Sequence, residues 1–124
     1  MAEDSLDIRN YKSNDIVFKE GEAGDAAYIV EKGIVEISKE SSSGGAALML
    51  ATIKRGKMFG EMALIDTSPR MATARAVGNT TLIVIPKAAF GKLLNKTDVV
   101  IRTILNTVMD RLRNQTDQNI KKTL

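Results

Sequence analysis

The hydrophobic pattern of this 124-residue chain changes its period at Pro86, and that change limits the folds open to it. Before Pro86, short β-rich runs at residues 16–18, 28–30 and 34–37 are separated by turn residues. Several short strands at this spacing predict a sandwich, a barrel or a jelly roll. After Pro86, the apolar residues follow helical spacing instead. The expected fold class is therefore mainly β, with helices at the C-terminal end.

Turn residues divide the β part of the chain further. Residues 31–33 (Glu-Lys-Gly) predict a tight turn between two strands. The polar loop 41–45 predicts the tip of a hairpin whose second strand lies in the apolar run 46–53. Another turn is expected at 54–57, and a last strand at 81–85. Because aromatic residues make up only 4% of the chain, the core is expected to be aliphatic.

Two helices are expected after the strands. A proline at its first position favours the start of the first helix, and Thr97 with Asp98 predicts the start of the second. The β part is expected to span about residues 11–85 and the helices about residues 86–118. Together they predict a single domain over residues 1–124.

The second helix carries an apolar stripe along one face. Its members fall at helical spacing, and they are Ile101, Ile104, Leu105, Val108 and Leu112. This stripe has two interpretations. It packs on the sheet, or it forms the seam of a homodimer through helix 98–112.

Composition excludes much chemistry. The chain has no cysteine and no histidine, so disulfides, thiolate nucleophiles, Cys/His metal centres and a serine–histidine triad are excluded. No carboxylate pair or nucleophile–base arrangement stands out, so the chain is expected not to be an enzyme. The acidic N-terminus and the lack of a long apolar run predict a cytoplasmic protein with no membrane segment.

Residues 59–74 hold the unusual chemistry of the chain. Gly60 lets a backbone approach a ligand, and residues 61–64 predict one helical turn whose N–H groups favour an anion. Arg70 supplies a permanent charge with a planar fork of donors, which suits two phosphate oxygens. This segment therefore predicts a pocket for one anionic and one hydroxyl-bearing group.

This segment resembles the phosphate-binding cassette of the cyclic-nucleotide-binding domain family. The family pattern F-G-E-[LMI]-A-L, a spacer and P-R-x-A-T is similar to residues 59–64 (FGEMAL) and 69–73 (PRMAT). Catabolite activator proteins, protein kinase A regulatory subunits and cyclic-nucleotide-gated channels belong to this family. The resemblance covers about residues 11–112. It implies a double-stranded β-helix (jelly roll) with a cassette and a lid helix, and a ligand that is cyclic AMP (cAMP) or cyclic GMP (cGMP).

The resemblance also implies roles for particular residues. Arg70 is expected to pair with the cyclic phosphate, and Glu61 to accept a hydrogen bond from the ribose 2′-hydroxyl. The implied ligand-binding residues are Gly60, Glu61, Met62, Ala63, Arg70, Met71 and Ala72. Met71 departs from the Ala, Ser or Thr that is common there. A Thr at that position is associated with cGMP, so its absence mildly favours cAMP.

Four further hypotheses stay open at this stage. Aligning the end of the last helix with the activators places Gln115 and Thr116 at possible base contacts. Glu61 and Arg70 could instead form a structural ion pair. The chain could be the ligand-binding part of an activator-type transcription regulator without its DNA-binding domain, since no helix-turn-helix fits before Leu124. It could also be a degenerate interaction module, with Met71 filling the phosphate site.

Overall fold

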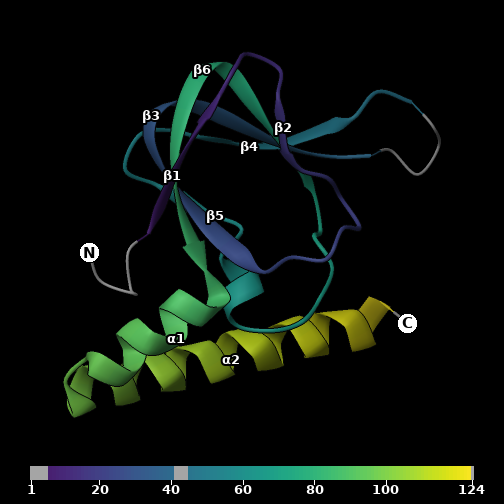
Figure 1. Cartoon of the computed structure of the whole chain (residues 1–124). Helices are drawn as coiled ribbons and strands as arrows, with labels where there is room; N and C mark the ends of the chain where they lie inside the picture. The colour runs from purple at the N-terminus through teal and green to yellow at the C-terminus, as the bar shows by residue number, and fades with distance from the viewer. Residues whose placement is uncertain (1–5, 41–44, 124) are drawn as a thin grey trace.

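A rolled antiparallel sheet forms the body of the protein, and two helices lie at one end of it (Figure 1). The computed structural model describes residues 6–40 and 45–123, with side chains as far as Gln115. The strands are β1 (Asp7–Tyr11), β2 (Ile16–Phe18), β3 (Ala26–Lys39), β4 (Leu48–Ile53), β5 (Met58–Phe59) and β6 (Thr73–Pro86). A 3₁₀ helix, η1 (Glu61–Leu64), follows β5. The predicted fold class, mainly β with C-terminal helices, is confirmed.

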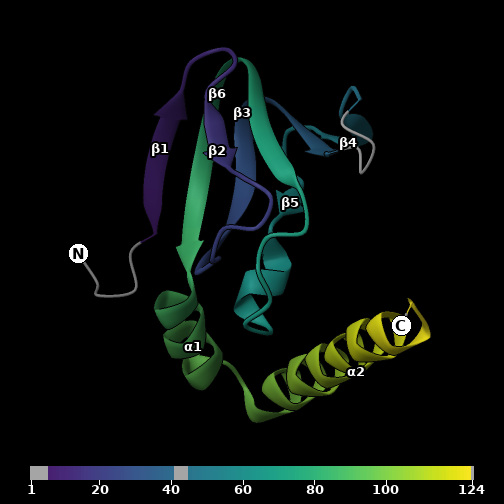
Figure 2. The same ribbon diagram turned by 90° about the vertical axis from the view of Figure 1, so that its right-hand side faces the viewer.

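Two long strands hold the sheet together. β3 and β6 each have 14 residues and pair antiparallel from Ala26↔Pro86 to Ser38↔Thr73. β1 and β2 pair with successive parts of β6, and β4 and β5 pair with successive parts of β3. Each long strand thus pairs with two short strands in succession. The sheet curves around its core instead of lying flat, as Figures 1 and 2 show.

The tight turn predicted at residues 31–33 is wrong. β3 continues through these residues, and its pairing with β6 shifts register between Val30 and Ile34. Gly33 has φ +90°, and a Cβ there would lie 2.5 Å from Oγ1 of Thr80 and 2.7 Å from the carbonyl oxygen of Asn79. A left-handed glycine pressed against a partner strand is typical of a β-bulge, which bends the strand without reversing it. Gly33 therefore marks a bend within β3 and not a turn between two strands.

Two strand boundaries also differ from the sequence expectation. The β part begins at Asp7 and not at about residue 11, with a strand, β1, that the sequence did not predict because its side chains are exposed or half-buried. Its backbone pairs with the edge of β6 from Val84 to Thr80, so pairing and not hydrophobicity makes it a strand. β6 extends back from the predicted 81–85 to Thr73, because β2 and β3 flank its first half.

The expected aliphatic core contains an aromatic cluster. Phe18, Tyr28 and Phe59 are buried, and their ring centroids lie 5.2–6.0 Å apart. The three rings come from β2, β3 and β5, and Val30, Val35, Leu82 and Val84 complete the core around them. A low aromatic content therefore did not exclude aromatic packing, because most of the few rings gather in one place.

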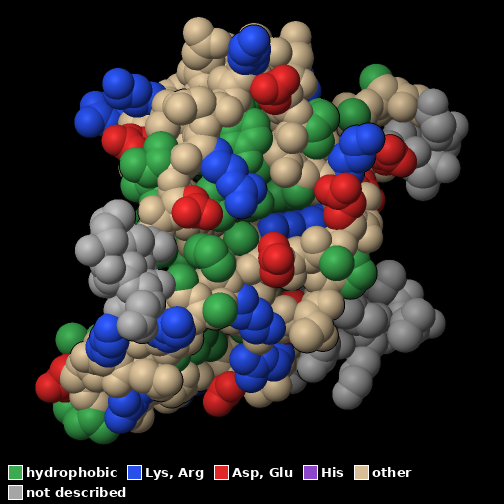
Figure 3. Space-filling model, viewed as in Figure 1, with side chains coloured by type: hydrophobic (Ala, Val, Ile, Leu, Met, Phe, Trp, Pro, Cys, Tyr) green, Lys and Arg blue, Asp and Glu red, His purple; other side chains and the backbone are tan. Residues whose placement is uncertain are grey.

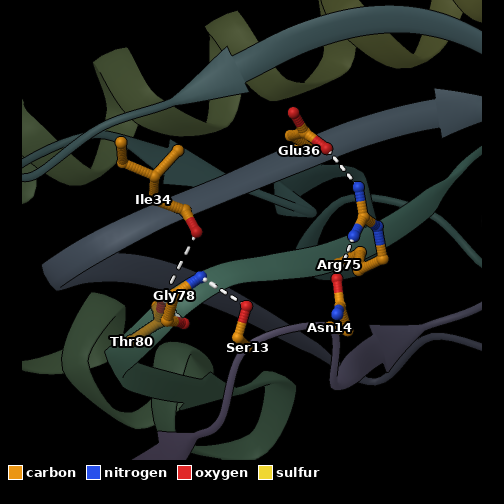
Figure 4. A network of polar contacts seen from close by, with 7 residues as sticks. All are labelled: Ser13, Asn14, Ile34, Glu36, Arg75, Gly78 and Thr80. Atoms are coloured by element: carbon orange, nitrogen blue, oxygen red, sulfur yellow. Dashed lines mark hydrogen bonds and ion pairs between the residues drawn. The ribbon is translucent and has the colours of Figure 1, made fainter.

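A network of polar contacts connects the loop between β1 and β2 to β3 and β6 (Figure 4). Arg75 donates to Glu36 on β3 and to Asn14, so one guanidinium joins three segments. The N–H of Gly78 donates to the hydroxyl of Ser13, and the Thr80 hydroxyl donates to the carbonyl of Ile34. These contacts tie the loop before β2 to the two central strands.

The helices are α1 (Lys87–Lys96) and α2 (Val99–Thr123). Pro86 is the N-cap residue of α1, and Asp98 accepts a hydrogen bond from the N–H of Val100 at 2.8 Å at the start of α2. α2 continues past the expected end at residue 118. In the part of the chain that the structure describes, no helix has both the length and the hydropathy to cross a membrane.

The apolar stripe of α2 does not pack on the sheet. Ile101, Ile104, Leu105, Val108 and Leu112 are between 38% and 56% exposed. The half-buried residues of α2 are instead two arginines and a methionine, Arg102, Arg113 and Met109. Arg113 donates to the carbonyl oxygen of Ile65, and Arg102 donates to that of Asn95. Figure 2 shows α2 diverging from α1 and passing below the η1 end of the sheet. Of the two interpretations of the stripe, packing on the sheet is therefore wrong.

Candidate functional site

The residues predicted to bind a ligand line one cavity. Its volume is about 270 Å³, close to the lower end of the range for small-molecule pockets. All seven implied residues contribute to its wall: Gly60, Glu61, Met62, Ala63, Arg70, Met71 and Ala72. Apolar residues from the strands, including Ile37, Ile53 and Met58, also line the cavity, and we call these three the apolar wall. Figure 3 shows hydrophobic side chains exposed in the middle of one face, with Lys and Arg side chains below them over the helices.

Gly60 is required by its conformation and by its surroundings. It has φ +71°, in the left-handed region, and it is the N-cap residue of η1. A Cβ at this position would lie 2.9 Å from Nη1 of Arg70 and 3.2 Å from the Phe18 ring. The glycine therefore lets the chain turn sharply into η1 while it passes close to the arginine.

Arg70 is buried and lacks a counter-charge. Its residue exposure is 8%, and its Nη1 and Nη2 donate to the carbonyl oxygens of Gly60 (3.1 Å) and Ala26 (2.7 Å). Its Cζ lies 4.0 Å from the centroid of the Phe18 ring. Among the described residues it makes no ion pair, and its buried Nε has no hydrogen-bond partner. The structural ion pair between Glu61 and Arg70 is therefore not formed.

A buried cation without a carboxylate is costly unless something else stabilises it. Carbonyl dipoles and an aromatic face stabilise Arg70 in part. Arg70 lines the cavity, and no described carboxylate neutralises its charge. This combination is typical of functional sites, where a charge is kept in place for a ligand.

The turn before β3 fixes Arg70 in position. The N–H of Gly21 donates to the Arg70 carbonyl at 2.7 Å, and the Arg70 N–H donates to the Glu22 carbonyl at 2.8 Å. A Cβ on Gly24 would lie 2.7 Å from both Cζ and Nε of Arg70. In the sequence, Gly24 reads only as a turn residue between two strands. Its second role, leaving room for the guanidinium, depends on contacts between segments almost fifty residues apart and has no local signal.

Tyr28 lies on the other side of the same arginine. Its ring centroid is 5.8 Å from Cζ of Arg70. Burial raises the pKa of the Tyr28 hydroxyl above its ordinary value, and the nearby Arg70 charge lowers it in part. Tyr28 therefore remains neutral at physiological pH, and it cannot neutralise the arginine.

Glu61 has the opposite environment. It is exposed at the cavity mouth and makes no hydrogen bond or ion pair with another described side chain. Ala63 and Ala72 beside it are buried and small, so they leave the cavity floor accessible. Met71 is 60% exposed at the rim, so its side chain does not fill the cavity. The cavity therefore has a buried cation at one side and a free carboxylate at its mouth.

The structure also shows contacts to the cassette that sequence reasoning missed. Nε and Nη2 of Arg113 on α2 donate to the Ile65 carbonyl oxygen at 3.0 and 2.6 Å, just after η1. Nζ of Lys39 donates to the Met71 carbonyl oxygen at 3.3 Å. Gln115 is exposed and is not among the lining residues, and the Thr116 side chain lies outside the described residues. The base contacts expected for those two stay predictions.

Known proteins with the same arrangement are numerous. A family model described as the cyclic nucleotide-binding domain matches residues 8–97. The cAMP-dependent protein kinase regulatory subunit of Yarrowia lipolytica is 40% identical over 91 residues, which is 73% of this chain and 23% of that protein. The Emericella nidulans regulatory subunit is 33% identical over 99 residues, which is 80% of this chain and 23% of that protein. The chain thus spans about a quarter of the length of these curated relatives.

Solved structures agree with this match. The half-site-occupied form of the EAL enzyme Bd1971 is 32% identical with a TM-score of 0.83, covering 90% of this chain and 99% of that one. The catabolite activator protein of Thermus thermophilus is 26% identical with a TM-score of 0.74, covering 95% of this chain and 54% of that one. With the rolled sheet, the cassette and the buried arginine in place, the chain belongs to the cyclic nucleotide-binding domain family.

Proposed function

We propose that this chain is a non-catalytic regulatory module that binds cAMP or cGMP in the cavity beside Arg70. The observation that carries the proposal is the buried Arg70 guanidinium without a counter-charge. A cyclic phosphate is a monoanion that would neutralise this guanidinium. Solved relatives include a Toxoplasma gondii protein kinase A regulatory domain with cAMP, and cAMP- and cGMP-bound forms of Bd1971.

The exposed carboxylate fits the second half of the ligand. In this proposal Glu61 accepts a hydrogen bond from the ribose 2′-hydroxyl, which is a donor that a free carboxylate reads well. The apolar wall that includes Ile37, Ile53 and Met58 receives the base. The open cavity and the exposed Met71 side chain support binding over the degenerate alternative, in which Met71 fills the phosphate site.

The signal in this proposal passes through α2. Arg113 links α2 to the carbonyl oxygen of Ile65 at the end of η1. A ligand that draws Glu61 inward changes the position of that carbonyl, and it thereby shifts the equilibrium of the helix. The chain itself is proposed to act in the cytoplasm and to make no direct contact with DNA.

Calorimetry with both nucleotides tests the proposal. Purified protein is expected to release or absorb heat on titration with cAMP or cGMP and to bind one molecule per chain. Absence of any heat at millimolar concentrations of both nucleotides would refute it. Noncyclic AMP is the matched control, because its dianionic, open phosphate does not fit a site built for a ring monoanion.

The exposed stripe of α2 supports a homodimer through helix 98–112. Leu105, Val108 and Leu112 continue the heptad spacing that begins at Ile101, which suits a two-helix seam. Light scattering after gel filtration should give twice the chain mass, and Leu105→Glu should give the monomer mass. A monomer mass for the unmodified chain at high micromolar concentration, with nucleotide present, would contradict the dimer.

A further inference from the structure

Lys39 is not itself a lining residue of the cavity, but it lies next to two residues that are, Ile37 and Met71. Along β3, side chains two residues apart share one face of the sheet. Val35 on this face is in the core, and Ile37 lines the cavity. Lys39 is the next residue on the same face, and β3 pairs with β6 without a register shift from Ile34 to Ser38. Its ammonium lies beside Met71, which is itself a lining residue.

Two contacts hold the Lys39 ammonium at this place. Its Nζ lies 3.3 Å from the Met71 carbonyl oxygen and 3.6 Å from Oε2 of Glu20. The other Glu20 oxygen accepts a hydrogen bond from the N–H of Glu40 at 2.9 Å. Both oxygens of the Glu20 carboxylate are therefore engaged, and the carboxylate is not available to a ligand.

The ammonium keeps a donor for a ligand. Lys has three N–H donors and no acceptor, and the two contacts above use two of them. The Lys39 side chain is 48% exposed, so a ligand in the cavity mouth can reach the third donor. Lys39 is thus a held cation that presents a donor beside the wall proposed to receive the base.

We infer that Lys39 is a specificity-determining residue that favours guanine over adenine in the bound nucleotide. This inference rests on the proposed function. Guanine presents two acceptors, O6 and N7, on the edge where adenine presents a donor, N6, beside its N7 acceptor. An ammonium that can only donate meets two acceptors in guanine and a donor in adenine. Lys39 therefore favours cGMP.

Met71 favours cAMP, but its effect is smaller than that of Lys39. Met71 has no hydroxyl and therefore offers the base no hydrogen bond, whereas Lys39 offers a charged donor. Met71 has no polar side-chain atom for either base beyond a weak thioether acceptor, and its side chain points into solvent at 60% exposure. The Lys39 ammonium therefore decides the preference between the bases. The mild preference for cAMP expected from Met71 is replaced by a preference for cGMP.

Calorimetric titration with three nucleotides tests the inference. Cyclic IMP has the O6 and N7 of guanine but lacks its 2-amino group. The unmodified chain should bind cGMP and cyclic IMP about five- to tenfold more tightly than cAMP, at the low end expected for such a contact because Lys39 is half exposed. Lys39→Met should remove this difference and leave the cAMP affinity within about twofold. Lys39→Arg should keep it, because its fork also only donates.

Matched variants separate a specific role from a loss of charge. Lys92→Met removes one positive charge at an exposed position of α1, which contributes no lining residue, and should leave the ratio of the affinities unchanged. A preference for cAMP in the unmodified chain, or an equal loss for all three nucleotides in Lys39→Met, would overturn the inference and leave the proposed function standing. No binding of any nucleotide to the unmodified chain would overturn both.

Discussion

The two halves of the cassette carry their charged groups in opposite ways. Arg70, in the second half, is buried, and the backbone of the 21–22 turn holds it on both sides. Glu61, in the first half, is exposed on a four-residue 3₁₀ helix. The first half contacts β3 and α1, and it accepts two hydrogen bonds from Arg113 of α2, whose side chain is 43% exposed.

We therefore expect the two halves of the cassette to have different roles in binding. A charge that must receive a phosphate at a fixed place benefits from being held before the ligand arrives, because less ordering entropy is then lost on binding. The exposed Glu61 side chain can move toward the ligand, and this movement can be transmitted to α2 through the Ile65 carbonyl oxygen and Arg113. In the proposed function, the fixed half provides affinity, and the movable half couples binding to α2.

Arg70→Met is expected to have the largest effect on binding. Losing one side of a buried charge pair should weaken nucleotide binding by about 2–5 kcal/mol. The stability of the ligand-free protein should change little, because the loss of the hydrogen bonds to the Gly60 and Ala26 carbonyl oxygens is offset by the removal of an unpaired buried cation. Calorimetry and thermal unfolding of the same sample measure the two quantities.

Arg75→Met is the control for that experiment. Arg75 is paired with Glu36 and Asn14 at the far end of the roll (Figure 4), so its loss should reduce stability by about 1 kcal/mol. Nucleotide affinity should stay within about twofold. If Arg70→Met destabilised the protein more than Arg75→Met did, the arginine would be a structural element of the fixed half and not a ligand group.

Gly24→Ala tests the fixed half without changing any charge. Its Cβ would meet the Arg70 guanidinium at 2.7 Å, so the guanidinium must shift from its place. Such overpacking costs about 1–3 kcal/mol, which we expect to appear mainly as lost affinity. Gly91→Ala is the same change at a helical position with no atom within 4 Å, and it should leave affinity unchanged while stabilising α1 slightly. Equal affinities for the two variants would contradict the close fit.

Glu61→Ala tests the movable half, with a smaller expected loss. A hydrogen bond to this exposed carboxylate should be worth about 1.5 kcal/mol. The 2′-deoxy form of the nucleotide removes the other partner, so a double-mutant cycle isolates the contact. If the two losses add without coupling, Glu61 does not read the 2′-hydroxyl.

Arg113→Met is expected to have the smallest effect, and a local one. Its two hydrogen bonds to the Ile65 carbonyl oxygen hold α2 to the cassette, so its loss should speed amide hydrogen exchange in α2 by up to about tenfold. Exchange in β3 and β6 should not change. Arg111→Met, on an exposed side of the same helix, is the control, and identical exchange in both variants would argue against the link.

Much of the site could be predicted because its signals are local. Gly60, Glu61 and Arg70 lie within eleven residues, and the spacing of small residues around them marks a close approach whatever the rest of the chain does. The roles of Gly24, Lys39 and Arg113 could not be predicted in this way. Each depends on a contact with the cassette across at least 32 residues of sequence.

The amino-acid sequence by itself determined the change from strands to helices at Pro86, the helical turn at residues 61–64 and the choice of Arg70 as the arginine proposed to bind an anion. These follow from hydrophobic period, turn chemistry and residue type, which act over a few neighbours. Only the tertiary structure decided that Gly33 bends β3 instead of reversing it and that Arg70 is buried without a carboxylate. It also decided that the apolar stripe of α2 faces outward. Burial and pairing depend on which distant segments meet, and no local pattern records that.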